Sequence, residues 1–97
     1  MLTGNQKRYL RGLAHHRKPA VIVGANGVTE AVLSEIDQAL SHHELLKVKL
    51  PAVDSTARKT IVEHVCSATG AHWVQTIGRM GVIYRPAAEP SITLPDA

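Results

Sequence analysis

The stretch VIVGANGVTEAVL constrains the fold more than any other part of the chain, because it joins a strand pattern to a helix pattern through two glycines. The continuous apolar run from Ala20 to Val23 is typical of a central strand. The residues after the glycines repeat at the spacing of one buried helix face, namely Val28, Val32, Ile36, Ala39 and Leu40. A strand leading into a helix predicts a layered α/β fold with the loop from Gly24 to Gly27 at the carboxyl end of the strand.

A further helix and strand flank this unit. Thr3 and Gln6 have the spacing of a capping box, so a first helix is expected from about Asn5 to His15. Gly12 inside it suggests close packing or an early helix end. The helix after the glycines should end near His42 or His43, and residues 46–50 then alternate apolar side chains with lysines, the pattern of a half-exposed strand with a cationic outer face. The two outward lysines are Lys47 and Lys49.

The last third of the chain contains a helix pattern and a hairpin pattern. Asp54 or Ser55 can cap a third helix, and Gly70 can close it. Its expected buried positions are Ala57, Ile61, Val65 and Ala68, with Val62 and Cys66 adjacent. Two strand patterns, His72–Ile77 and Val82–Arg85, are separated by GRMG, which predicts a tight hairpin.

The resulting order of helix, strand, helix, strand, helix, strand and strand fits one α/β (α+β) domain, because 97 residues are too few for two. Strand-helix-strand units favour parallel pairing, and the short last connection favours an antiparallel pair. We therefore expect a four-stranded mixed sheet packed with helices over residues 1–86. The prolines from residue 86 onward predict an extended or flexible tail over residues 87–97.

Positive charge is concentrated in the first 29 residues, which contain five cations and no acidic residue, although the net charge is only +3. These cations are Lys7, Arg8, Arg11, Arg17 and Lys18. Such a segment attracts polyanions, above all nucleic acid or an anionic membrane surface. Because no apolar run approaches the ~20 residues that cross a bilayer and no secretory signal pattern opens the chain, we expect a cytoplasmic protein without membrane association.

The loop GANG is a candidate phosphate contact. At the start of a helix, unpaired N–H groups and the positive end of the helix dipole converge, and an anion fits there. Gly24 and Gly27 would allow a positive φ and a close approach of the backbone to the ligand. A four-residue G-x-x-G pattern is also common as turn geometry alone, and GRMG is a second copy that joins two strands.

The run LRGLAHHRKPAVIVGANGVTEAVLSEIDQALSHHELLKVKL, together with GRMGVIYRP, resembles the CRM domain of chloroplast RNA splicing and ribosome maturation proteins. The best match is the stand-alone bacterial YhbY-like form, over roughly Gln6 to Pro86. The resemblance implies a KH-like RNA-binding module, related in fold to the carboxyl-terminal domain of a bacterial translation initiation factor. It also implies association with RNA of the large ribosomal subunit in pre-ribosomal particles.

In that family the strand-to-helix G-x-x-G loop is the expected RNA contact. The resemblance carries this role to Gly24, Ala25, Asn26 and Gly27, whereas the second glycine of GRMG is expected to serve turn chemistry. Neither Ala25 nor Asn26 is basic, although KH-type loops often carry a cation there. The cations expected to contact RNA beside the loop are Lys7, Arg11, Arg17, Lys18, Lys47 and Lys49.

Two other classes compete with an RNA-binding module. An enzyme is disfavoured, because the six histidines lack metal-ligand spacing and neither paired carboxylates nor a nucleophile elbow is evident. We therefore expect no catalysis, no cofactor and no metal, and Cys66 is expected to be a reduced buried thiol. An adaptor that binds a ribosomal protein or assembly factor without direct RNA contact remains the alternative. The protein is expected to be a monomer.

Overall fold

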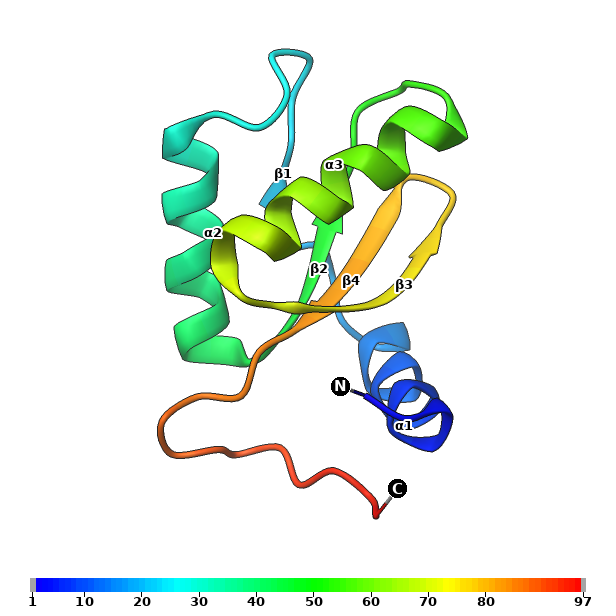
Figure 1. Ribbon diagram of the computed structural model, residues 1–97, viewed down its shortest axis with the longest axis vertical. Coiled ribbons are helices and arrows are strands. Elements are labelled where there is room, and N and C mark those ends of the chain that lie inside the picture. The colour runs from blue at the N-terminus through cyan, green and yellow to red at the C-terminus, as the bar shows by residue number, and fades with distance from the viewer. Residues whose placement is uncertain (1, 97) are drawn as a thin grey trace.

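The computed structural model describes residues 2–96, and its elements follow the predicted order (Figure 1). They are α1 (Gly4–His15), β1 (Val21–Ile22), α2 (Glu30–His43), β2 (Leu45–Lys49), α3 (Ser55–Thr69), β3 (His72–Ile77) and β4 (Met80–Tyr84). The four strands form one mixed sheet in the order β1-β2-β4-β3. The predicted fold class is therefore confirmed.

The helix boundaries follow from short-range capping. The predicted capping box is present, since the Thr3 side chain accepts from the Gln6 N–H and the Gln6 side chain accepts from the Thr3 N–H. Asp54 caps α3 by accepting from the Ala57 N–H at 2.8 Å. Gly70 ends that helix in the left-handed region, with φ of 75°, where glycine carries no steric penalty.

The sheet is mixed, as predicted, but the position of β1 in it differs from the prediction. β1 pairs in parallel with β2, and β4 pairs antiparallel with both β2 and β3. β2 and β3 therefore run in the same direction without being neighbours, because β4 lies between them. The prediction that Ala20 to Val23 form a central strand is wrong: β1 is a two-residue edge strand, and only alternate side chains, Val21 and Val23, are buried.

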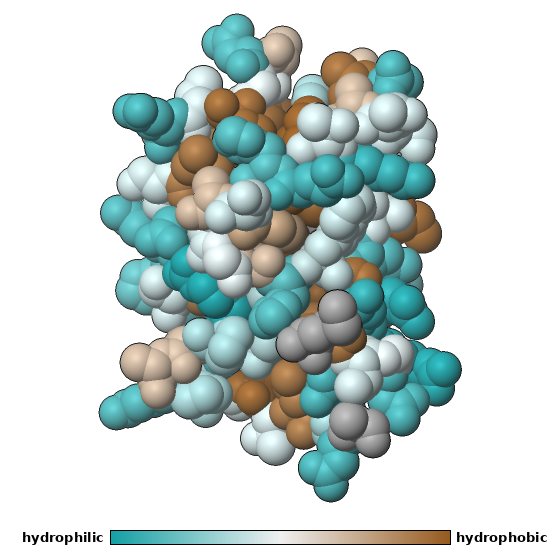
Figure 2. All heavy atoms as spheres, viewed as in Figure 1, coloured by the Kyte–Doolittle hydropathy of each residue, from teal (hydrophilic) through white to brown (hydrophobic). Residues whose placement is uncertain are grey.

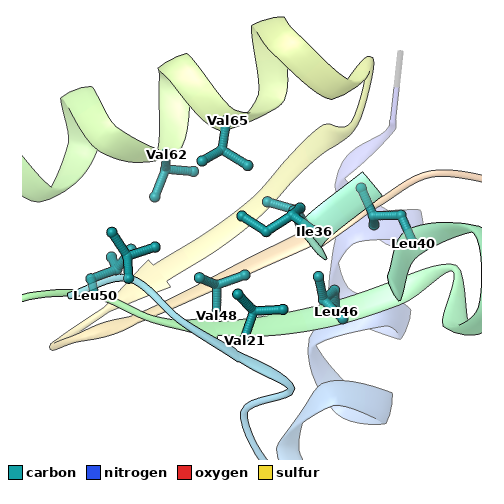
Figure 3. Packing of buried hydrophobic residues seen from close by; sticks show 10 residues of the cluster. Val21, Ile36, Leu40, Leu46, Val48, Leu50, Val62 and Val65 are labelled. Carbon is teal, nitrogen blue, oxygen red and sulfur yellow. The ribbon is translucent and has the colours of Figure 1, made fainter. Parts of the chain in front are cut away.

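One face of the sheet is covered by α2 and α3. Figure 3 shows Ile36 and Leu40 of α2 and Val62 and Val65 of α3 directed toward side chains from the strands. The cluster also includes Val21, Leu46 and Val48 from the strands and Leu50, which directly follows β2. On its outer side this helical layer presents mostly hydrophilic residues, with hydrophobic ones showing in places between them (Figure 2).

The other face of the sheet is covered only in part. Leu10 and Ala14 of α1 pack against Leu45, Val82 and Tyr84 in a second cluster. Two residues of the C-terminal segment, Ile92 and Leu94, add to the edge of this cluster. Since α1 and the C-terminal segment lie toward one end of the sheet, no helix within residues 2–96 covers the rest of this face (Figure 1).

Two predicted details are corrected by the packing. Ala68 is exposed and Thr69 is buried instead. The Thr69 hydroxyl can be buried because it donates a hydrogen bond to the Val65 carbonyl within the helix, at 2.8 Å. In GRMG, the positive φ belongs to the first glycine, Gly78, at 54°. Gly81 lies within β4 and serves packing rather than the turn, since a Cβ there would meet the Val62 side chain at 3.1 Å.

Candidate nucleic-acid interface

The loop GANG projects from the end of β1, beyond the body of the sheet (Figure 1). Its base is held by the Val23 N–H, which donates to the Lys49 carbonyl at 2.8 Å. The Gly27 N–H closes a turn on the Gly24 carbonyl at 3.0 Å, and Gly27 has φ of 75°. Ala25 and Asn26 at the tip are exposed. The loop therefore presents its backbone and two small side chains to solvent.

The loop does not open α2 directly, contrary to the prediction. The helix cap is Thr29, whose hydroxyl accepts from the Val32 N–H at 3.2 Å, and the helical residues begin at Glu30. Threonine is a side-chain cap and satisfies an amide that a glycine would leave free, which explains why the helix starts there. Gly24 also does not adopt the predicted positive φ. The loop and the helix N-terminus are thus separate features.

The predicted cations gather mainly around two adjoining hollows on the partly covered side of the sheet. The first, of about 450 Å³, lies where the entry to β1 meets the end of α2. The second, of about 370 Å³, lies between α1 and the sheet. The first hollow is lined by the cations Arg17, Lys18 and Lys47 and by His42 and His43. The second is lined by the cations Arg11 and Lys47 and by His15.

Lys47 lines both hollows and so makes them one surface, which we call the basic trough. Among the described residues that line it, none is acidic. Clefts lined by one sign of charge concentrate the field and attract counter-ions or charged ligands. The basic trough therefore suits a polyanion.

Two of the predicted cations, Lys49 and Lys7, do not line the trough themselves, but each is near a residue that does, on the same strand or helix. Lys49 is two residues beyond Lys47 on β2, so both side chains lie on the same face of the sheet. Lys7 is one helical turn before Arg11, on the same side of α1, and it is half-buried. The loop GANG begins at the carboxyl end of β1, at the end of the sheet away from α1 (Figure 1).

Arg17 also has a structural task. Its guanidinium donates to the Leu45 carbonyl at 2.8 Å and to the His43 carbonyl at 3.4 Å. These bonds fix the segment before β1 against the junction of α2 and β2. Arg17 therefore shapes the wall of the basic trough as well as contributing charge.

Sequence reasoning passed over several residues of this surface. His15, His42 and His43 line the trough because they fall in the last turns of α1 and α2. Histidines at helix C-termini are a recognisable signal, since cations interact favourably there with the helix dipole. Arg79 of the hairpin is a further cation, whose Nε donates to the Leu50 carbonyl at 3.0 Å, and the hairpin leaves the same end of the sheet as the loop GANG (Figure 1).

Two charged residues in the runs that resemble the CRM domain, Glu44 and Arg85, stabilise the fold and do not line the basic trough. Glu44 is buried, and its carboxylate accepts bonds from the N–H groups of Ala87, Ser91 and Ile92 and from the Ser91 hydroxyl. The Ser91 hydroxyl, followed by these backbone bonds, holds the pKa of Glu44 at about 2 against the opposing effect of burial. Glu44 thus fastens the C-terminal segment to the domain.

Arg85 joins three elements. Its guanidinium donates to the Asp37 carboxylate at 2.6 Å, to the Thr69 carbonyl at 2.7 Å and to the Ser41 hydroxyl at 3.0 Å. These partners belong to α2 and to the end of α3, while Arg85 directly follows β4. Arg85 is therefore a structural cation.

Three further observations concern chemistry. Within residues 2–96, no three histidine, cysteine or acidic side chains lie together as a metal site would require. No helix in that part of the chain is long and apolar enough to cross a membrane. Cys66 is half-buried, and burial raises the pKa of its thiol to about 11, which keeps it protonated at neutral pH.

Comparison with known proteins matches residues 2–85 to the model of the CRS1/YhbY (CRM) domain. A protein of Haemophilus influenzae named an RNA-binding protein is 49% identical over 94 residues, which cover 97% of this chain and 95% of the relative. A protein of Pseudomonas aeruginosa named a probable RNA-binding protein is 40% identical over 93 residues, which cover 96% and 89%. A solution structure of a Staphylococcus aureus protein superimposes with a TM-score of 0.86 at 42% identity, covering 98% of this chain and all of that one.

Proposed function

The chain belongs to the CRS1/YhbY (CRM) domain family, and from this premise we propose that it binds RNA and acts in the assembly of the large ribosomal subunit. It does so without catalysis or cofactor, in the cytoplasm. RNA binding is supported by the names of the relatives and by the surface of this chain. The assembly role is supported by the family resemblance.

The observation that carries RNA binding is the basic trough, whose described lining contains cations and histidines and no acid. Phosphate contacts from lysine and arginine supply most of the affinity of a protein for nucleic acid. Backbone N–H groups fix the register of the bound strand. The exposed loop GANG offers such groups next to Lys49, whose carbonyl holds the base of the loop.

The loop contact is tested with the double variant Ala25→Asp, Asn26→Asp, which introduces two negative charges at the tip. We expect RNA affinity to fall by about tenfold or more, which corresponds to about 1.4 kcal/mol, because the charges repel phosphates. Ala25→Asn is the matched control, since Asn has the shape of Asp and Asn26 stays unchanged. If the folded acidic variant binds RNA as tightly as the parent, the loop is not part of the interface.

The GRMG hairpin is unsuitable as a control for this experiment. The hairpin between β3 and β4 lies at the same end of the sheet as the loop GANG (Figure 1), and Met80, the first residue of β4, lines the basic trough. Substitutions there would alter a second part of the proposed interface.

The assembly role is tested by crosslinking the protein to RNA in cells and sequencing the attached RNA. Reads should concentrate in the RNA of the large ribosomal subunit and its precursors. Reads spread over messenger RNA would leave RNA binding in place and contradict the assembly role. A failure to crosslink, combined with recovery of a ribosomal protein, would favour the adaptor alternative.

A further inference from the structure

The open part of the sheet carries a row of four side chains that crosses all four strands. The pairing register sets Ile22 of β1 beside Lys49 of β2, Lys49 beside Met80 of β4, and Met80 beside Ile77 of β3. Paired residues on neighbouring strands direct their side chains to the same face. At the two ends of the row, Ile22 is 65% exposed and Ile77 is 63% exposed.

These two isoleucines are unusual for this chain. The described residues contain only four exposed large hydrophobic side chains, and two of them terminate this one row. Isolated exposed apolar residues need no explanation, but apolar residues aligned on one open face mark an interaction surface. The row, which we call the aliphatic row, is therefore a candidate contact surface.

The surroundings of the aliphatic row identify the kind of partner. Met80 and Ile77 line the basic trough, and Lys49 lies within the row itself. The neighbouring row on the same face contains Lys47, paired with Val82, and Gln75, which also pairs with Val82 at a bulge. Apolar contacts are thus flanked by cations and by one amide, with no acidic residue among the described lining of the trough.

We propose that the aliphatic row binds the unpaired bases of an RNA strand whose phosphates lie along the basic trough. This inference rests on the proposed RNA binding and extends it from the loop GANG to the face of the sheet. Aliphatic side chains contact the faces of splayed bases, the Gln75 amide bonds to base edges, and Lys47 and Lys49 hold the phosphates. A duplex keeps its bases stacked inside and offers these isoleucines no apolar partner.

The first experiment replaces the apolar ends of the row by Ile22→Thr with Ile77→Thr. Both side chains are exposed, and threonine retains β-branching, so the fold is expected to persist. Binding of a single-stranded RNA of about 12 nucleotides should weaken about fivefold to tenfold, comparable to the loss of contact with one base. The dependence of affinity on salt should stay the same, because no cation is removed. The control is Val53→Thr, an exposed apolar residue outside the row.

The second experiment places a charge at the edge of the trough through Gly12→Glu, with Gly12→Gln as the neutral control of equal shape. Gly12 lines the trough, and no atom lies within 4 Å of a Cβ added there. Both substitutions favour the helix, so a difference in binding reports charge rather than folding. We expect Gly12→Glu to bind single-stranded RNA at least about fivefold more weakly than Gly12→Gln.

The outcomes separate this inference from the proposed function. Weaker binding by the isoleucine variant, with a preference of the parent for the strand over the same strand in a duplex, supports the inference. Equal binding of strand and duplex, or parent affinity in the isoleucine variant, overturns it while RNA binding stands. If the parent binds neither RNA form and instead captures an acidic protein through this face, both proposals fail.

Discussion

At the scale of single residues, Glu44 shows how a local anomaly is maintained by long-range bonds. It is a non-glycine residue with φ of 63°, a conformation that is costly for a side chain bearing a Cβ. Its N–H donates to the Leu40 carbonyl, and its own carbonyl accepts from the Arg85 N–H. Its carboxylate accepts hydrogen bonds from the C-terminal segment. The strained backbone thereby lets one residue end α2, begin the turn into β2 and hold the tail.

The lowered pKa of Glu44 predicts acid sensitivity. The pKa falls from an ordinary 4.5 to about 2 in the folded protein, so the ionised carboxylate stabilises the fold at pH values above about 4.5. That contribution should be lost progressively as the pH falls from about 4.5 to about 2. Glu44→Gln should be less stable by about 2 kcal/mol at neutral pH, because it loses charge-assisted hydrogen bonds.

Urea unfolding of parent and Glu44→Gln across this pH range measures the effect. The difference between the two should shrink toward acid pH, whereas Glu89→Gln, an exposed acid of the C-terminal segment, should track the parent. A constant difference from pH 7 to pH 2 would contradict the assigned role of the carboxylate.

At the scale of elements, α1 is fixed by its capping box and its two buried side chains, Leu10 and Ala14, while Arg11 and His15 line the trough between the helix and the sheet. The glycine at position 12 was expected to mark close packing or an early helix end, and neither is present. The helix continues to His15, and space is open beside Gly12. The glycine therefore lowers helix stability without any packing requirement in the folded chain.

Gly12→Ala should consequently raise the free energy of unfolding by about 0.5–1 kcal/mol, because alanine loses less backbone entropy in a helix. The melting temperature and urea midpoint measure this directly. Gly81→Ala is the contrasting variant, since its Cβ would meet the Val62 side chain at 3.1 Å, and it should not share the gain. A destabilised Gly12→Ala would show that the open space beside the helix is needed by the fold.

At the scale of the whole molecule, the acidic side chains are absent from the part of the chain where the basic side chains are concentrated. Acidic side chains occur on α2 and directly after it, on or before α3 and in the C-terminal segment, whereas residues 2–29 contain none. The part of the basic trough that α1 borders lies on the side of the sheet opposite to the α2 and α3 layer, and the end of α2 completes its lining through His42 and His43. This separation leaves a cationic surface although the net charge is only +3.

RNA affinity should therefore depend steeply on salt. With about four to six phosphate contacts, the slope of log K against log salt should be roughly −3 to −4, at ~0.7 per contact for single strands. The triple variant Arg11→Gln, Lys18→Gln, Lys47→Gln should reduce the slope by about 2, with Lys59→Gln on α3 as the control. A slope near zero for the parent would exclude binding through the RNA backbone.

The sequence by itself determined those features that a few neighbouring residues control. The capping box at Thr3, the cap at Asp54, the left-handed Gly70 and the hairpin at GRMG each depend on contacts within about one turn of chain. The order of elements and the mixed sheet followed from these signals and from hydrophobic periodicity. The acid-free amino-terminal segment was likewise evident from composition.

Only the tertiary structure decided which distant residues meet. β1 pairs only with β2 and is therefore an edge strand, and the insertion of β4 between β2 and β3 aligned Ile22, Lys49, Met80 and Ile77 in one row. Helical and strand periods assign each side chain to a face but not to a partner on another element. The bonds from Glu44 to Ser91 and from Arg85 to Asp37 join residues more than 40 positions apart along the chain, so no local pattern could indicate them.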